Sequence, residues 1–174
     1  MSEVADLVCR KLDELGVAYR MISHPPLFHM DECAAAGERL GAVVCKNYFL
    51  TTKSHKVHCL CVVRPEARLR TADVSKQAGT ARLSFAGEDE LEQLLRAKPG
   101  SVSPLGLLFD PECRVRLLID RALLAEDWLA FHPCDNTRTL SIATADLIGR
   151  FLPAVGHDFT PVEIHDFDEN QSFS

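Results

Sequence analysis

The chain has 174 residues, the length of a single domain that can bury one core without disulfides or a metal. Its composition, 47% hydrophobic and 25% charged, is that of a soluble globular protein, and no apolar run approaches the roughly 18 residues that a membrane-spanning helix needs. A net charge of −6 argues against a protein that coats nucleic acid without selection.

The first predicted elements are a helix, a strand and a second helix. Apolar residues at helical spacing predict a helix over 2–15, with Ser2 placed to cap it and Gly16 to stop it. An alternating pattern predicts a strand over 17–23, which ends in a proline-containing turn. An alanine-rich run then predicts a short helix near 31–39.

The middle of the chain predicts a β-hairpin followed by shorter elements. Two apolar, β-branched runs at 42–52 and 57–63 are separated by a polar Lys-Ser-His-Lys and indicate an antiparallel pair. A short helix at 72–78 and a short strand at 82–85 follow. A helix at 87–96 carries three acids in its first turn, where the helix dipole favours them.

The last third predicts four more strands and a final helix, at 105–109, 114–120, 127–133, 137–143 and 144–152. Six or seven strands mixed irregularly with helices indicate an α+β fold, with a mixed, mostly antiparallel six- to seven-stranded sheet and surrounding helices in a single domain. We expect this domain to span 1–155 and a loose, acidic tail to span 156–174.

The N-terminus and the cysteines bear on the compartment. The polar, acidic N-terminus lacks the layout of a secretion signal, and seven cysteines without paired spacing read as reduced thiols, so we expect a cytoplasmic protein. Cys59 and Cys61 alternate with apolar residues and should share one face of a strand. His55 and His58 nearby leave a metal as an alternative, but the four-residue ligand sets of zinc sites do not occur. We expect no metal and no cofactor.

Basic residues concentrate in the middle of this acidic chain. Residues 44–85 carry eight basic and two acidic side chains. Such a segment can hold a polyanion locally while the rest of the chain repels it. A solvated basic face without a partner explains the same charges.

Three segments contain polar residues that a core does not require. Lys46 and Asn47 interrupt an apolar strand, and because burying an unpaired ammonium is costly, the lysine must face solvent or a polar cleft. The loop 100–106 has two glycines, two serines and a proline, and its N–H groups can bind an anion, a carbonyl oxygen or a water. An exposed lysine and an ordinary connecting loop are the alternatives.

The third segment, 131–137, places His-Pro and Asp-Asn-Thr at the end of an apolar strand. Its polar groups can form a site, or a turn stabilised by its own Asp and Asn. Cys134 beside His132 also allows a cysteine nucleophile, although a catalytic cysteine normally meets a histidine from elsewhere in the fold.

Taken in order, four segments resemble one family, the YbaK/ProX aminoacyl-tRNA deacylases, whose fold is shared by the editing insertion of bacterial prolyl-tRNA synthetase. The segments are Lys46-Asn47, LSFAGEDELEQLL (83–95), PGSVSPLGLL (99–108) and FHPCDNTRTLSI (131–142). The resemblance is strongest to the freestanding alanine-editing branch, because the cysteine-editing branch lacks the His-Pro-x-x-Asn-Thr segment. These 174 residues contain no segment that resembles a synthetase domain, so we expect the protein to act in trans.

The resemblance implies hydrolysis of the ester that joins an amino acid to the terminal adenosine of tRNA, without a metal or a covalent intermediate and with help from the substrate's ribose hydroxyl. It assigns the carbonyl oxygen or a terminal phosphate to Lys46, and the orientation of that end to Asn47. The loop, with Gly100, Ser101, Ser103, Pro104 and Gly106, is expected to cradle the ester and the water.

The resemblance also implies a substrate, alanine on proline tRNA. His132, Asn136 and Thr137 are expected to shape a small amino-acid pocket. Ser103 and Leu105 stand where relatives often have Thr and Phe, which leaves serine or another small amino acid open. The basic segment, through Arg68 and Arg70, is expected to face the acceptor stem of the tRNA.

Two other functions remain open at this point. One is a tRNA- or nucleic-acid-binding module that has lost the reaction, and the other is a partner of prolyl-tRNA synthetase or of the elongation machinery. DNA is a poor candidate, because no helix-turn-helix spacing is present and the chain is acidic. No membrane partner is expected.

Overall fold

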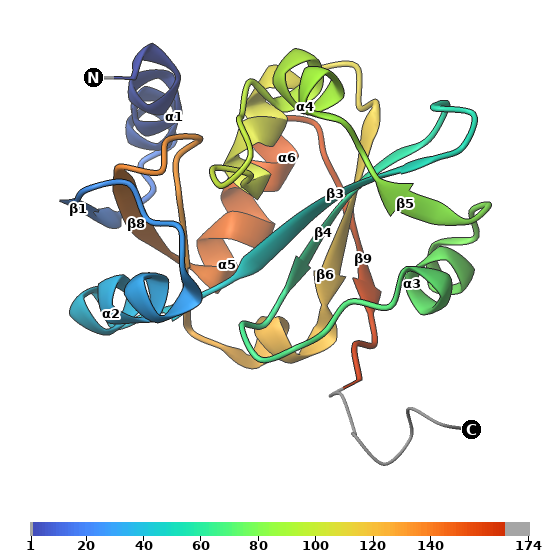
Figure 1. The fold of residues 1–174 in the computed structure, drawn as a ribbon. Coiled ribbons are helices and arrows are strands. Elements are labelled where there is room, and N and C mark those ends of the chain that lie inside the picture. The colour runs from blue at the N-terminus through green and yellow to red at the C-terminus, as the bar shows by residue number, and fades with distance from the viewer. Residues whose placement is uncertain (1, 166–174) are drawn as a thin grey trace.

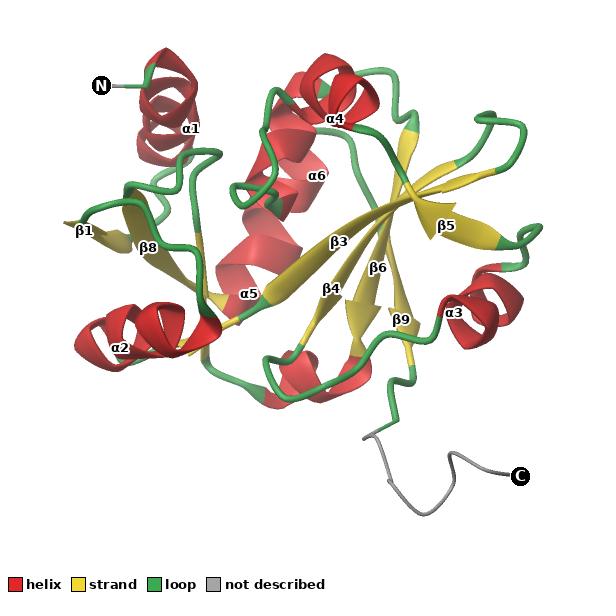
Figure 2. Ribbon diagram, in the orientation of Figure 1, coloured by secondary structure: helices red, strands yellow, loops and turns green. Residues whose placement is uncertain are grey.

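Two β-sheets and the helices packed on them make up residues 2–165, the part of the chain that this computed structural model describes. The small sheet has the strand order β1-β8-β7-β2 and the large sheet the order β5-β3-β4-β6-β9 (Figure 2). The strands are β1 (Tyr19–Ser23), β2 (Val43–Val44), β3 (Lys46–Thr52), β4 (His58–Val63), β5 (Leu83–Phe85), β6 (Val115–Asp120), β7 (Trp128–Phe131), β8 (Arg138–Ala143) and β9 (Phe159–Val162).

The helices lie close to the predicted positions. Ser2 caps the first of them, accepting a hydrogen bond from the N–H of Ala5 (3.3 Å), and Gly41 ends the second with φ 64°. A final helical segment, with a π-helical stretch at its centre, lies between the two sheets (Figure 1). The helices are α1 (Glu3–Glu14), α2 (Met30–Leu40), α3 (Thr71–Ala78), α4 (Glu88–Leu95), α5 (Thr144–Asp146) and α6 (Leu152–Ala154).

The α+β prediction is confirmed, and both sheets are mixed. The predicted hairpin is present, since β3 pairs antiparallel with β4, and four of the seven strand pairings are antiparallel. Within residues 2–165 the chain forms nine strands divided between two sheets, whereas the sequence predicted one sheet of six or seven strands. The predicted domain nevertheless stays a single one, because one apolar core is shared by both sheets.

The division arises within the run predicted as one strand, 42–52. Its first residues, Val43 and Val44, pair in parallel with β7 of the small sheet, and the N–H of Cys45 reaches the carbonyl oxygen of Ala130 (3.4 Å). From Lys46 onward the chain pairs with β4 of the large sheet. The step from one sheet to the other therefore comes directly before Lys46 and Asn47.

The core has two parts, on opposite faces of the large sheet. The main cluster lies between the sheets and includes buried residues of α4 and of the final helical segment. The second cluster lies under α3 and includes Cys59 and Cys61, which confirms that these two thiols share one face of β4.

The predicted strand over 105–109 is wrong. These residues belong to a 3₁₀ helix, Pro104–Phe109. Ser103 caps it by accepting a hydrogen bond from the N–H of Leu105 (3.1 Å), and proline suits its first position because the missing N–H has no partner there. An apolar run of this length fits either a strand or a helix, and the Ser-Pro start signal favours the helix.

The fold continues past the predicted domain end at 155. β9 pairs in parallel with β6 at the edge of the large sheet, where the proline at 161 is tolerated because an edge strand leaves one side unpaired. The remainder of the predicted acidic tail, 166–174, lies outside the described residues. Among residues 2–165 no helix has the length and apolar character needed to cross a membrane.

Candidate active site

A pocket of about 330 Å³ lies where the chain passes from the small sheet to the large one. Its walls come from residues 27–30 and Cys33 at the start of α2, from residues 44–48, from the loop residues Gly100 and Val102, and from residues 130–132 of the small sheet. Of the residues that the sequence singled out, Lys46, Asn47, Gly100 and His132 line this one pocket. Segments far apart in the chain therefore meet there.

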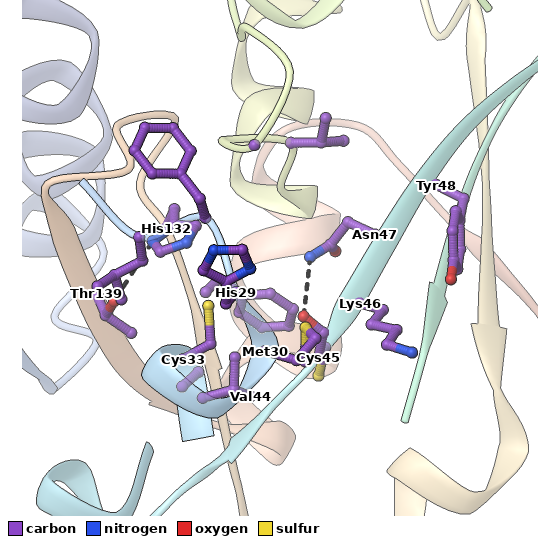
Figure 3. A pocket seen from close by; sticks show the side chains of 16 residues that line it. His29, Met30, Cys33, Val44, Cys45, Lys46, Asn47, Tyr48, His132 and Thr139 are labelled. Carbon is purple, nitrogen blue, oxygen red and sulfur yellow. Dashed lines mark hydrogen bonds between the residues drawn. The ribbon is translucent and has the colours of Figure 1, made fainter. Parts of the chain in front are cut away.

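Lys46 and Asn47 line the pocket from opposite sides of β3. Neighbouring residues of a strand point to opposite faces, and Figure 3 shows Lys46 on the side of Tyr48 with Asn47 on the side of His132. Lys46 is half-buried, and within residues 2–165 its ammonium forms no ion pair or hydrogen bond. A lysine without a protein partner at a pocket wall is available to an anion or a carbonyl oxygen.

Asn47 has a buried oxygen without a partner. Its Nδ2 donates to the carbonyl oxygen of Cys45 (3.3 Å), whereas its Oδ1 is buried and accepts no hydrogen bond within the described residues. A buried acceptor left unpaired costs about 1–3 kcal/mol, so it favours any ligand that brings a donor.

His132 is held in a defined tautomer. Its Nδ1 lies 2.8 Å from the carbonyl oxygen of Arg138 and must donate to it, because a carbonyl oxygen only accepts. Burial is the main cause that lowers the pKa of His132 from its ordinary value of 6.5, and the nearby His24 lowers it further. The ring is therefore neutral at pH 7, with the lone pair on Nε2.

Two residues to which the sequence assigned no role, His24 and Thr139, support this ring. Thr139 Oγ1 lies 2.7 Å from His24 Nε2 and 3.3 Å from His132 Nδ1, and the two imidazole rings lie edge to face with centroids 6.0 Å apart. His24 Nδ1 donates to the carbonyl oxygen of Pro25 (2.9 Å), so its Nε2 accepts the hydroxyl proton of Thr139. Only the β1–β8 pairing brings these residues together, and nothing in the sequence signals that pairing.

The sequence analysis did not predict that the start of α2 lines the pocket. Phe28, His29, Met30 and Cys33 line the pocket, and Glu32 orders this corner by accepting hydrogen bonds from the N–H groups of Phe28 (3.1 Å) and His29 (3.2 Å). The sequence identified a helix here, but helical spacing does not say which turn faces a site.

The glycine loop presents two free N–H groups. Gly100 has φ 87°, a conformation that favours glycine, and both Gly100 and Val102 line the pocket. The N–H groups of these two residues form no hydrogen bond within residues 2–165. Two backbone donors at one wall are suited to a carbonyl oxygen that gains negative charge.

The other predicted loop residues do not line the pocket but hold the loop. Ser101 Oγ is 3.0 Å from the N–H and 2.9 Å from the carbonyl oxygen of Lys98, and Ser103 and Pro104 start the 3₁₀ helix. Gly106 is required for packing, because a Cβ there would lie 2.9 Å from the carbonyl oxygen of Leu95.

Asn136 and Thr137 also lie behind the pocket wall. Thr137 donates to Asp135 Oδ1 through its N–H (2.9 Å) and its hydroxyl (2.7 Å), which makes the self-stabilised turn that the sequence offered as an alternative. The carbonyl oxygens of Thr137 and Asn136 accept from the N–H groups of His24 (2.9 Å) and Leu27 (3.4 Å). Both residues therefore support the segment that leads into the pocket.

Arg68 and Arg70 are not brought to the pocket. They line a separate, small cavity beside α3 together with Glu163 and His165. Both follow β4 and approach the face of the large sheet that bears the second core cluster, where Ala67 and Leu69 are packed.

The structure also bears on two alternatives from the sequence analysis, a cysteine nucleophile and a metal site. All seven cysteines are free, and burial raises the pKa of Cys134 to about 12, so this thiol is protonated at pH 7 and is a poor nucleophile. No group of three or more histidine, cysteine or acidic side chains among residues 2–165 has a geometry suited to a metal ion.

Comparison with known proteins gives one consistent result. Residues 24–149 match the model of the aminoacyl-tRNA editing domain. The chain is 31% identical to the prolyl-tRNA editing protein ProX of Acetoanaerobium sticklandii, over 90% of this chain and 95% of the relative, and 36% identical to prolyl-tRNA synthetase associated domain-containing protein 1 of Danio rerio, over 87% and 81%. In fold it matches a candidate trans-editing enzyme for prolyl-tRNA synthetase, with a TM-score of 0.67 at 16% identity over 94% of this chain and 98% of the other. The chain belongs to the aminoacyl-tRNA editing domain family and is an aminoacyl-tRNA deacylase.

Proposed function

We propose that this protein hydrolyses mischarged tRNA in trans, with alanine on proline tRNA as its main substrate, and that it needs no metal. The observation that carries the proposal is that an amide oxygen and two backbone N–H groups without partners in residues 2–165 line one pocket with a neutral imidazole, while Lys46 lines the same pocket from the other side of β3. The name of the relative ProX, a prolyl-tRNA editing protein, supports proline tRNA as the carrier.

Hydrolysis of an aminoacyl ester needs only a modest catalyst, because the ester is already reactive. The protein has mainly to position a water molecule and to stabilise the oxyanion. Water attacks the ester carbonyl carbon, the bond to the ribose oxygen breaks, and that oxygen leaves as a hydroxyl, so free amino acid and tRNA result. We assign the carbonyl oxygen, which becomes the oxyanion when water adds, to the N–H groups of Gly100 and Val102. Lys46 holds the terminal phosphate or donates to this same oxygen.

Asn47 and His132 present acceptors to the donors that the substrate brings. Asn47 Oδ1 and His132 Nε2 are both acceptors without a partner within the described residues. An aminoacyl ester with its attacking water carries two suitable donors, the α-amino group and the water itself. We propose that these two acceptors orient them, with Asn136 and Thr137 acting only through the wall that they support.

We propose that the size of the pocket selects a small amino acid. Met30 and Cys33 line the pocket from α2, and we propose that their side chains leave room for alanine but not for proline. A synthetase cannot fully exclude alanine from a site built for proline, since the smaller side chain still fits and a missing methylene changes binding by only about 10–200-fold. A second site that is too small for proline removes the error, which is the division of labour we propose here.

Deacylation of alanine-charged and proline-charged proline tRNA, measured in EDTA, tests the proposal. We expect rapid loss of alanine only, and loss of that activity in Lys46→Ala. Lys53→Ala is the matched control, because Lys53 is an exposed lysine at the other end of the same strand pair. Deacylation that requires added metal would contradict metal independence. If the wild-type protein binds tRNA but deacylates neither substrate, it is a binding module and not an enzyme.

We further propose that the protein works beside prolyl-tRNA synthetase in the cytoplasm, where tRNA is charged. The name of the Danio rerio relative supports such an association. Co-purification of the tagged full-length chain with prolyl-tRNA synthetase after ribonuclease treatment is the expected result, and an association that disappears with the RNA would mean that tRNA alone joins them.

A further inference from the structure

An exposed aromatic residue lies on the sheet face that carries Lys46. Phe85 is 66% exposed, and it pairs across the sheet with Leu50, so both side chains point to the same face. Lys46 and Tyr48 precede Leu50 by four and two residues along β3 and therefore share this face as well.

The aromatic rings continue outward from the pocket. Tyr48 lines the pocket, and its ring centroid lies 6.0 Å from that of Phe85 with an angle of 51° between the planes. Tyr48 is half-buried and Phe85 exposed, so the two rings and Lys46 form a strip from the pocket wall to the surface. A lone exposed phenylalanine is ordinary, but one that extends a ring lining a pocket is not explained by packing.

Lys46 gives the strip a positive charge that has no protein partner within residues 2–165. The strip lies within residues 44–85, the segment with eight basic and two acidic side chains. The acidic residues that follow Phe85 in the chain, Glu88 and Asp89, begin α4, whose buried Leu91, Leu94 and Leu95 pack on the opposite face of the sheet.

We propose that Tyr48 and Phe85 form a stacking platform for the unpaired 3′ nucleotides of the aminoacyl-tRNA, an inference that rests on the proposed function. The ester must enter the pocket at the end of a single strand, and the bases next to it must cross the surface beside the pocket. Proteins bind single strands by combining aromatic rings, on which bases stack, with positive charge along the backbone. The strip offers both, and its flat rings would accept any base.

The test compares a full substrate with one that lacks the neighbouring nucleotides. We expect Phe85→Ala to lower kcat/KM on alanyl-tRNA by about 5- to 100-fold, the range for loss of one stacked base, chiefly through KM. On adenosine esterified with alanine, the same variant should match the wild type, because no further base is present. Phe85→Trp should retain activity on alanyl-tRNA.

Trp128→Ala is the matched control, since Trp128 is 40% exposed and lines a different groove with Glu126 and Asp127. Unchanged kcat/KM on alanyl-tRNA in Phe85→Ala would overturn the platform, and so would an equal loss on both substrates, which would indicate a structural role. Loss of binding to prolyl-tRNA synthetase with unchanged tRNA binding would assign the strip to a protein partner instead. A wild type inactive on both substrates would refute the proposed function, and the affinity of Phe85→Ala for uncharged tRNA would then decide on the platform separately.

Discussion

At the scale of single residues, the pocket depends on a histidine that stays neutral. Burial lowers the pKa of His132, and its Nδ1–H is committed to a carbonyl oxygen, so protonation would occupy the free Nε2. We expect kcat for deacylation, corrected for spontaneous hydrolysis, to fall as the pH drops below 6.5, because the charged ring no longer accepts a hydrogen bond.

A pH–rate profile checks this. His132→Gln should lower the rate and remove the acid limb, while His165→Gln, at the separate cavity beside α3, should leave the limb in place. An acid limb that persists in His132→Gln would contradict this role of His132.

A second residue-scale prediction concerns Gly106. A Cβ at this position would lie 2.9 Å from the carbonyl oxygen of Leu95 and 3.3 Å from Cys134 Sγ, and both neighbours are buried. Gly106→Ala should therefore lower the free energy of unfolding by about 1–3 kcal/mol, as overpacking does. Urea denaturation measures it, with Gly149→Ala as the control, because no atom lies within 4 Å of a Cβ there. Equal midpoints for the two variants would contradict the packing role.

At the scale of elements, one carboxylate fastens α4 to the β3–β4 hairpin. Glu90 Oε1 accepts from His55 Nδ1 (2.7 Å) and His58 Nε2 (3.0 Å), and Oε2 accepts from the N–H of Gly87 (3.1 Å). The hydrogen bond from His58 is the largest of the causes that lower the pKa of Glu90 to about 2. The charged form is therefore the one that the fold stabilises.

Glu90→Gln should destabilise the protein by about 1–2 kcal/mol at pH 7, somewhat less than the roughly 1.5–3 kcal/mol of a buried hydrogen bond to a charged group, because the Glu90 side chain is partly exposed to water. Because the pKa is lowered on folding, the carboxylate's contribution is complete above the ordinary value of 4.5 and is lost as the pH falls towards 2. The difference in melting temperature between variant and wild type should therefore shrink over that window. Glu88→Gln, in the same helix turn and exposed, is the control. If the difference in melting temperature did not depend on pH, the charge of Glu90 would make no contribution to stability.

Local sequence predicted some of these elements but not others. Helix ends were predictable from Ser2 and Gly41, because a cap and a left-handed stop act on the nearest backbone groups. The run 105–109 was not, since apolar residues without a period fit either structure and the choice depended on the cap at Ser103. Strand β9 was missed because proline at 161 argues against a strand unless the strand lies at an edge, which is a property of the assembled sheet.

At the scale of the whole molecule, variants of Arg68 and Arg70 can show which face of the protein binds tRNA. They lie away from the pocket, on the side of the sheet that also bears Lys46 and Phe85. If they bind phosphates, the double variant Arg68→Glu/Arg70→Glu should weaken tRNA binding and reduce the slope of log K against log salt by about 0.9 for each phosphate that is no longer neutralised.

Arg10→Glu/Lys11→Glu on α1 is the control of equal charge, and Figure 1 shows α1 and α3 at opposite ends of the molecule. Filter binding of proline tRNA at several salt concentrations supplies the slopes. The same slope in both double variants would mean that only net charge matters and that neither Arg68 nor Arg70 binds a particular phosphate.

Local patterns were enough to predict the α+β class and most element positions, and they singled out Lys46, Asn47, Gly100 and His132 as polar residues or glycines that a core does not require. The family resemblance, and no local pattern, assigned these four residues to one site. Only the packed chain decided that the run 42–52 divides between two sheets, and this division opens the pocket beside Lys46. The same packing brought His24 to Thr139 and turned Asn136 away from the pocket. These outcomes depend on contacts between residues more than 100 positions apart in the chain or on sheet register, and neither is encoded in any short stretch of sequence.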